Sequence, residues 1–142
     1  VAVPNVTEAC LLTDTPYRET EDLSWWRDLL RRVGDLGPRC PVLTGVPFGP
    51  DRLGVMALDP ESGSIFQYHT PRVHDHFHGT GDIFSAACAG AMVRGKSLPE
   101  ALRLAADFTL ACIQVTCRDP NAPWYGAEFE KALHLLPGLL ER

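Results

Sequence analysis

The sequence predicts an α/β fold, and three observations lead to this. Helical and extended segments alternate near both ends of the chain. In the middle, two runs of alternating polar and apolar residues are separated by turn formers. Apolar residues recur at helical spacing in the segments between. At 142 residues, 45% of them hydrophobic and 22% charged, the chain is long enough to bury a core as one ordinary domain. It contains no internal repeat and no low-complexity segment.

The first part of the chain is predicted to hold a strand end and two helices. Residues 1–4 (Val-Ala-Val-Pro) have the composition of a buried strand entering a loop, and Asn5 is a candidate N-cap of a short helix that ends at Leu12. After a polar connection that contains a proline, apolar side chains recur at helical spacing over residues 21–33, and Gly34 is a good stop signal.

The middle of the chain is predicted to be extended. Residues 40–46 have the pattern of a short buried strand that ends in a turn. Residues 52–58 and 64–70 alternate in polarity, and the turn formers of 59–63 between them predict a hairpin. A third extended piece, residues 72–77, leads into a glycine-rich motif.

The last part of the chain is predicted to be helical. Residues 82–93 are rich in alanine and glycine, which makes a thin helix that can pack close to a sheet. Ser97 and Glu100 form the pattern of a capping box, which opens a helix whose apolar face continues to Ile113. A final helix is expected over residues 127–136.

Charge and cysteine usage exclude several classes of function. The net charge of −5 argues against a nucleic-acid-binding surface, and no run of about 18 apolar residues is present to cross a membrane. No secretory leader is recognisable, and the odd number of scattered cysteines fits free thiols in a reducing cytoplasm, which is the expected location. The five cysteines are Cys10, Cys40, Cys88, Cys112 and Cys117.

The run His78-Gly79-Thr80-Gly81-Asp82 carries the chemistry of this chain. Unpaired N–H groups and the helix dipole bind anions at a helix start, and a carboxylate placed there can accept a proton from an attacking hydroxyl. The motif therefore favours phosphoryl transfer. The structural alternative is a glycine turn with Thr80 or Asp82 as an ordinary N-cap. The run is neither a Walker loop nor GxGxxG, because no lysine is near and residue 84 is phenylalanine.

The stretch 78–95 resembles the signature of the ribokinase-like small-molecule kinases, and more narrowly that of bacterial pyridoxal (pyridoxamine) kinases, in which Gly-Thr-Gly-Asp opens a long helix. Residues 4–9 are similar to the Asn-x-x-Glu region of that family, and residues 43–46 to its strand-end threonine. Residues 98–113 resemble the helix after the motif, and residues 124–129 a tail of the bacterial branch.

The resemblance implies roles for the glycine motif. Asp82 would be the general base that takes the proton from the hydroxymethyl oxygen of the substrate. Gly79, Thr80 and Gly81 would supply the N–H groups of an anion hole for the transferred γ-phosphoryl group of ATP.

The resemblance also implies a nucleotide and metal site. Asn5 and Glu8 would hold Mg²⁺ through waters, and the alternative for this pair is an N-cap with a first-turn acid. Thr44 would contact the ATP phosphates, although its position also fits a turn residue. Val73 and Phe77 would line the adenine, and the alternative for them is an apolar pair in the core.

The family implies the fold and the reaction as well. The kinases are longer, so residues 1–142 are expected to be the C-terminal part of a single kinase domain whose N-terminal half is absent. This part is the nucleotide-binding half of a three-layer α/β/α sandwich with an inserted β-hairpin. The implied reaction is ATP-dependent phosphorylation of the 5′-hydroxyl of pyridoxal, pyridoxine or pyridoxamine.

Two other functions stay open: a hydroxymethylpyrimidine kinase of the same fold, and a non-catalytic nucleotide-binding fragment.

The expected cofactors are ATP as co-substrate, Mg²⁺ and a monovalent cation. The expected partners are ATP and a B6 vitamer, with no nucleic acid and no membrane, and a homodimer is expected. We expect the isolated 142-residue chain to be inactive.

His74, His76 and His78 share one face of the predicted extended segment, a spacing that a metal can use. No fourth ligand is evident, and the resemblance implies no metal there. The histidines are therefore not counted among the expected metal ligands.

Overall fold

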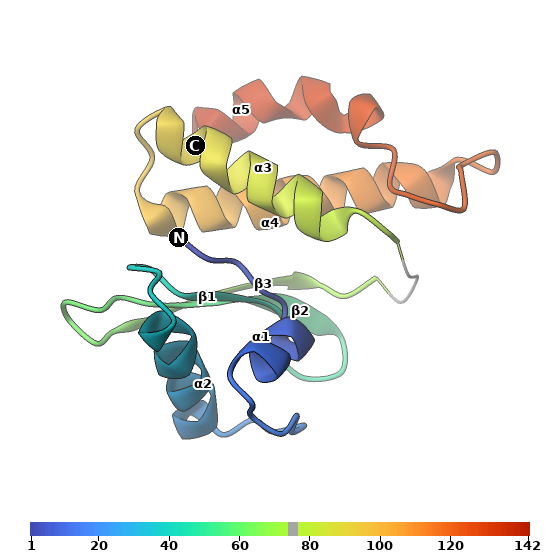
Figure 1. Cartoon of the computed structure of the whole chain (residues 1–142). Helices are drawn as coiled ribbons and strands as arrows, with labels where there is room; N and C mark the ends of the chain where they lie inside the picture. Colours follow the sequence, from blue (N-terminus) through green and yellow to red (C-terminus); the bar gives the residue numbers. More distant parts are fainter. Residues whose placement is uncertain (74–76) are drawn as a thin grey trace. The chain divides into compact units, whose positions relative to one another are not determined.

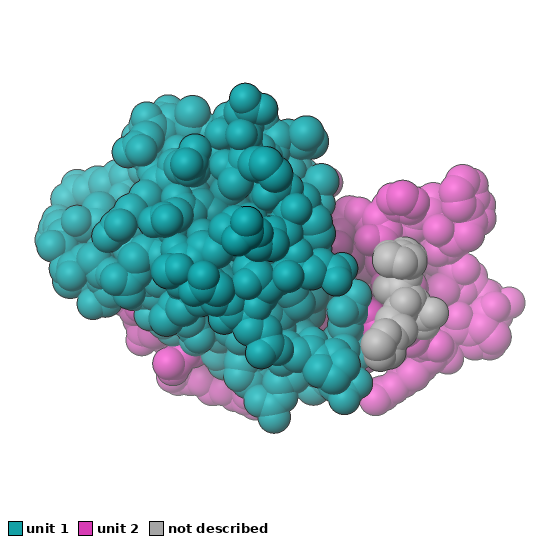
Figure 2. Space-filling model, turned by 90° about the horizontal axis from the view of Figure 1, so that it is seen from below, with its two compact units in different colours: residues 1–72 teal, residues 73–142 magenta. Residues whose placement is uncertain are grey.

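The computed structural model describes residues 1–73 and 77–142, and the chain divides into two compact units. Unit 1 comprises residues 1–72 and unit 2 residues 73–142, coloured separately in Figure 2. Unit 1 combines two helices with a small sheet, whereas unit 2 is helical (Figure 1). The predicted mixed α/β class is therefore confirmed.

Unit 1 begins with the two predicted helices, α1 (Val6–Leu12) and α2 (Leu23–Asp35). Asp22 is the N-cap of α2, because its carboxylate accepts a hydrogen bond of 2.9 Å from the N–H of Ser24. One stripe of α2 is buried at the spacing expected for a helix that covers a core. Its members are Trp26, Leu29, Leu30 and Val33.

The sheet of unit 1 is antiparallel and has the order β1 (Val42–Pro47), β2 (Arg52–Leu58) and β3 (Ile65–Pro71). Strands β2 and β3 form the predicted hairpin, with Val55 opposite Tyr68. The turn between them is closed by a hydrogen bond of 2.9 Å from the N–H of Asp59 to the carbonyl of Ser64.

Residues 1–5 run parallel to β1 and extend the sheet on that side. Bridges join Ala2 to Pro41 and Asn5 to Thr44, which confirms the expected strand end. The pairing of β1 with β2 shifts register between Thr44 and Val46, where Gly45 has a φ of 69°. The end of β1 therefore bends at a bulge directly after Thr44.

The core of unit 1 lies between its helices and one face of the sheet. Helices α1 and α2 both pack on this face (Figure 1). The buried members of the cluster are Val6, Ala9, Cys10, Trp26, Leu29, Leu30, Val33, Leu43, Val46, Met56 and Leu58. Residues 5 and 8, which lie on either side of Val6 and Thr7, are exposed, so this packing leaves them at the edge of the core.

Unit 2 is built on two packed helices, α3 (Thr80–Val93) and α4 (Leu98–Arg118). Helix α3 begins two residues earlier than the predicted start at Asp82. Helix α4 begins after Ser97 as predicted, with the carboxylate of Glu100 accepting a hydrogen bond of 2.8 Å from the N–H of Ser97.

The helix expected over residues 127–136 is present as two shorter segments that begin two residues later. A 3₁₀ helix, η1 (Phe129–Leu135), is followed by the short helix α5 (Leu136–Leu140). Pro137 lies in the first turn of α5, where its missing N–H costs nothing. Inside a longer α-helix the same ring would remove a hydrogen bond and clash with the preceding turn.

The predicted extended segment 72–77 precedes α3. Arg72, Val73 and Phe77 belong to no strand, and His74 and His76 of the histidine pattern lie outside the described residues. Within the described part of the chain, no helix has both the length and the apolar character needed to cross a bilayer.

Candidate functional site

The glycine turn (residues 78–82) opens α3 with a glycine in the left-handed conformation as the N-cap. Gly79 is the N-cap and has a φ of 80°, which favours glycine, and its carbonyl accepts a 3.0 Å bond from the N–H of Ile83. No side chain caps this helix. The alternative that Thr80 or Asp82 is an ordinary N-cap is therefore wrong. No capping side chain accepts a hydrogen bond from the first N–H groups of α3.

Asp82 lies exposed in the first turn of α3, where the positive end of the helix dipole stabilises a carboxylate. Gly81 is also exposed, and a Cβ at this position would meet open space, so a ligand can approach the backbone here. Val73 and Phe77 are half-buried. Their proposed contact with adenine stays a prediction.

Asn5 and Glu8 form a reciprocal capping box at the start of α1. The side-chain oxygen of Asn5 accepts a hydrogen bond of 2.8 Å from the N–H of Glu8, and Oε2 of Glu8 accepts one of 2.8 Å from the N–H of Asn5. Both residues are exposed. The structural role that the sequence left open is thus present, and the metal role stays a prediction.

The chemistry of this pair suits Mg²⁺, because both side chains offer oxygen and Mg²⁺ is held through waters and few carboxylates. One oxygen of each side chain already accepts a backbone N–H, which favours contact through water over direct ligation. In residues 1–73 and 77–142, no group of three or more His, Cys, Asp and Glu side chains is arranged to hold a metal.

Thr44 lies beside this capping box in unit 1. Its N–H donates a 3.0 Å bond to the carbonyl of Pro4, and it forms the parallel bridge with Asn5. The parallel pairing of residues 1–5 with β1 therefore brings Asn5 beside Thr44, and the capping box joins Glu8 to Asn5. In α/β folds, ligands bind at the carboxyl ends of parallel strands.

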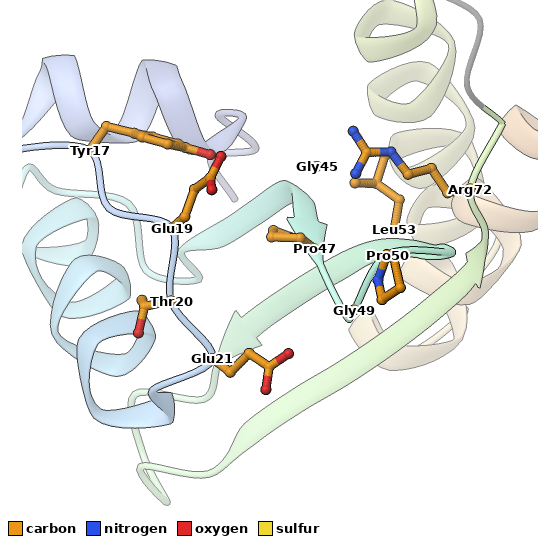
Figure 3. A pocket seen from close by; sticks show the side chains of 10 residues that line it. All are labelled: Tyr17, Glu19, Thr20, Glu21, Gly45, Pro47, Gly49, Pro50, Leu53 and Arg72. Atoms are coloured by element: carbon orange, nitrogen blue, oxygen red, sulfur yellow. The ribbon is translucent and has the colours of Figure 1, made fainter.

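A pocket of about 530 Å³ adjoins the bulge after Thr44, within unit 1. Its walls come from the loop between α1 and α2, the facing ends of β1 and β2 with the turn between them, and the residue after β3 (Figure 3). The lining residues are Tyr17, Glu19, Thr20, Glu21, Gly45, Pro47, Gly49, Pro50, Leu53 and Arg72. Sequence periodicity did not predict the pocket, because most of its walls come from loops and turns.

A backbone contact that was not expected from the sequence joins the glycine turn to the segment before η1. The N–H of Ala127 donates a 3.4 Å bond to the carbonyl of His78, and Gly126 lies next to the same carbonyl oxygen. Both partners belong to unit 2. The motif 124–129 was noted in the sequence, but nothing in its pattern indicated this neighbour.

Comparison with known proteins places these features among small-molecule kinases. A family model described as phosphomethylpyrimidine kinase matches residues 1–123. The hydroxymethylpyrimidine/phosphomethylpyrimidine kinase of Streptomyces coelicolor is 29% identical over 114 residues, which cover 80% of this chain and 40% of that protein.

Two solved structures are similar over nearly the whole chain. One is a Bacteroides thetaiotaomicron protein assigned as a phosphomethylpyrimidine kinase and crystallised with pyridoxal, with 32% identity and a TM-score of 0.86 over 95% of this chain and 48% of that one. The other is pyridoxal kinase from Lactobacillus plantarum, with 30% identity and a TM-score of 0.79 over 98% and 48%. The chain thus spans about half the length of these structures.

Proposed function

The chain belongs to the phosphomethylpyrimidine kinase family, and we propose that it supplies the base, the anion hole and the nucleotide site for ATP-dependent phosphorylation of the 5′-hydroxyl of pyridoxal, pyridoxine or pyridoxamine. The observation that carries this proposal is the glycine turn. Gly79 opens α3 in a left-handed conformation without a side-chain cap, and the carboxylate of Asp82 follows in the first turn.

In the proposed reaction, Asp82 accepts the proton of the 5′-hydroxyl while that oxygen attacks the γ-phosphorus of ATP. A new O–P bond forms, the bond from the γ-phosphorus to the β,γ-bridging oxygen breaks, and ADP leaves. The N–H groups of Gly79, Thr80 and Gly81 stabilise the charge on the γ-oxygens. A positioned base contributes about 10²–10⁴-fold, and electrostatic stabilisation of the transferred group contributes more.

The remaining predicted residues serve the nucleotide. Asn5 and Glu8 would hold Mg²⁺ through waters, and the ion, when bound, neutralises charge on the phosphates. Thr44 would contact the phosphates, and Val73 with Phe77 would line the adenine. A monovalent cation and a homodimer are further expectations of this proposal.

Phosphorylation of hydroxymethylpyrimidine is the second candidate, favoured by the description of the matching family and by the Streptomyces relative. The two candidates share the glycine turn and differ in the alcohol. Steady-state rates with pyridoxal and with hydroxymethylpyrimidine, measured on the same active protein, separate them. Stabilisation by ATP without turnover of either alcohol would instead favour the non-catalytic reading.

The base assignment is tested by Asp82→Asn in the catalytically competent protein that contains this chain. We expect kcat to fall about 10²–10⁴-fold, because the amide cannot accept the proton, while the affinity for ATP stays nearly unchanged. Glu130→Gln is the matched control, since Glu130 is an exposed acid in the first turn of η1 in the same unit. A near-normal rate for Asp82→Asn would refute the assignment.

A further inference from the structure

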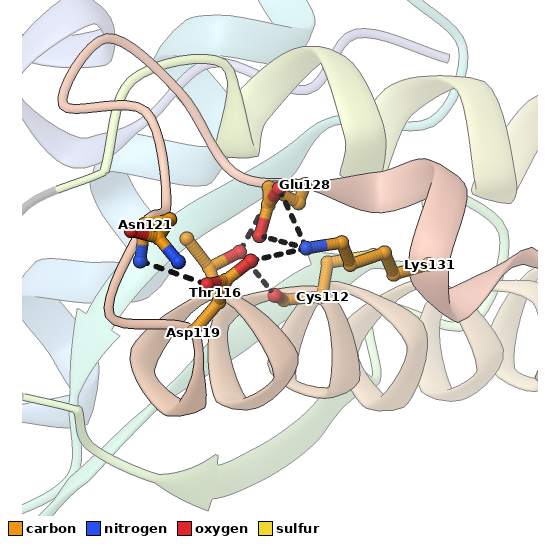
Figure 4. Close-up of polar contacts among 6 residues, drawn as sticks. All are labelled: Cys112, Thr116, Asp119, Asn121, Glu128 and Lys131. Carbon is orange, nitrogen blue, oxygen red and sulfur yellow. Dashed lines mark hydrogen bonds and ion pairs between the residues drawn. The ribbon is translucent and has the colours of Figure 1, made fainter.

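Thr116 is the one buried polar side chain in the described part of the chain, with 2% of its surface exposed. It lies in the last turn of α4, and its hydroxyl is satisfied in both directions (Figure 4). Oγ1 donates a 2.7 Å bond to the carbonyl of Cys112 and accepts a 2.9 Å bond from the N–H of Glu128. A buried polar group is costly when it loses a partner. The bond from Glu128 is therefore strongly favoured, and it fixes the backbone of Glu128 against α4.

Ion pairs hold the same segment from its exposed side. Lys131 on η1 contacts the carboxylate of Asp119 and lies 2.9 Å from Oε1 of Glu128. The hydrogen bond from Lys131 lowers the pKa of Asp119, which also accepts a 2.8 Å bond from the N–H of Asn121. Lys131 is exposed and the two carboxylates are half-buried, so each pair is partly screened by solvent, whereas the Thr116 hydroxyl is fully buried and is the stronger anchor.

Residue 127, next to this anchor, reaches the glycine turn. The side chain of Ala127 packs against the buried cluster of Phe108, Cys112 and Ala132, so its backbone has little freedom. Its N–H donates the 3.4 Å bond to the carbonyl of His78. One continuous set of contacts therefore runs from Thr116 through residues 128 and 127 to the peptide that enters the glycine turn.

That peptide links the carbonyl of His78 to the N–H of Gly79. In a trans peptide these two groups are coplanar and point in opposite directions. A contact that holds the carbonyl toward Ala127 thus directs the N–H of Gly79 the other way. We infer that Thr116 is a positioning residue for the anion hole, because it anchors the segment whose N–H fixes the orientation of the Gly79 amide. This inference rests on the proposed function, in which that amide binds the γ-phosphoryl group.

The direct test uses the 142-residue chain and amide spectroscopy. Thr116→Val keeps the shape and removes the hydroxyl, and Thr116→Ser restores the hydroxyl. We expect Thr116→Val to accelerate hydrogen exchange of the Glu128 and Ala127 amides about tenfold and to shift the Gly79 amide resonance, and Thr116→Ser to recover both. Thr116→Val with an unmoved Gly79 resonance would overturn the inference.

Thr109→Val is the matched control. Thr109 makes the same type of bond in the same helix, from Oγ1 to the carbonyl of Ala105 at 2.7 Å, but lies seven residues before Thr116. It should leave the Gly79 resonance unchanged, and an equal shift in both variants would also overturn the inference. Where Thr116→Val does not fold, replacement of Ala127 by the α-hydroxy acid lactate removes only the N–H, and the Gly79 resonance must still shift.

Kinetics separate this inference from the proposed function. In the active protein, Thr116→Val should lower kcat about tenfold with the KM for ATP nearly unchanged, because one anion-hole donor is misdirected, and Thr116→Ser should recover the rate. If Thr116→Val shifts the Gly79 resonance but the protein has no kinase activity, the proposed function is refuted and the positioning role is supported. Normal kcat together with an unmoved resonance would sink the positioning role alone.

Discussion

At the scale of single residues, burial decides how reactive the five cysteines are. All five are thiols outside any disulfide, as the sequence predicted, and Cys10, Cys88 and Cys112 are buried. Burial raises the pKa of all three thiols, that of Cys112 to about 11. Since the thiolate is the nucleophile, these residues are protected both by their pKa and by lack of access.

This predicts the order of alkylation in the folded chain. With iodoacetamide at pH 8, exposed Cys117 should react first and half-buried Cys40 second, while the three buried thiols react only after unfolding. Peptide mass spectrometry over time gives the order. Denatured chain, in which all five should react at similar rates, is the control, and early labelling of Cys112 in the native chain would contradict the expectation.

The same scale shows what a sequence can reveal of a site. Gly79 and Asp82 could be predicted as site residues because glycines and a carboxylate stand directly at a predicted helix start, and the structure shows Gly79 there in the left-handed conformation. Thr116 gave no such signal, since a threonine that bonds four residues back in a helix is common. Its second partner, Glu128, is twelve residues away, and only the folding of the intervening loop brings them together.

At the scale of elements, cap signals proved more informative than periodicity near the chain end. The starts of α1 and α4 were located from Asn5 and Ser97, because side-chain caps are local chemistry. The 3₁₀ conformation of residues 129–135 was not foreseen, because apolar spacing alone does not distinguish it from an α-helix ended by Pro137. The pocket beside β1 likewise depends on loop geometry that has no period.

The two capping boxes allow the cap role of Glu8 to be separated from its proposed metal role. Glu8→Gln and Glu100→Gln both keep an acceptor for the N-cap N–H and lose the charge, so each should lower the urea midpoint of unfolding only slightly. In the active kinase, Glu8→Gln should weaken the apparent Mg²⁺ affinity at least about 10-fold, and Glu100→Gln should not. Equal Mg²⁺ dependence in the two variants would assign Glu8 to the cap alone.

At the scale of the whole molecule, the family match over residues 1–123 confirms the resemblance drawn from short motifs. Those motifs are spread over both units: Asn5, Glu8 and Thr44 lie in unit 1, and the glycine turn lies in unit 2. Their order along the chain was therefore more informative than any one of them. A single glycine turn indicates an anion site, whereas the ordered set indicates a family.

Both units also share an acid-sensitive feature. Four carboxyl groups, three of them exposed and Asp119 half-buried, have a pKa below the ordinary value, in each case chiefly because the carboxylate accepts a side-chain hydrogen bond. They are Asp22 with Ser24, Asp59 with Ser62, Glu100 with Ser97, and Asp119 with Lys131. A group whose pKa is lower in the folded state binds fewer protons there than in the unfolded chain, so folding is favoured above its ordinary pKa.

The free energy of unfolding should therefore be nearly constant from pH 7 to about pH 5 and should fall below about pH 4, as pH passes through the lowered values. Urea unfolding at pH 7, 5, 4 and 3 measures this, and added salt should flatten the curve because three of the four groups are exposed. Asp59→Asn removes one of these titrating groups, so the free energy of unfolding should fall less steeply below pH 4. Asp35→Asn is the control, because Asp35 is not one of the four carboxyl groups with a lowered pKa. Stability that rises between pH 4 and pH 3 would contradict the assignment, since it would require these carboxyl groups to bind protons more tightly in the folded chain.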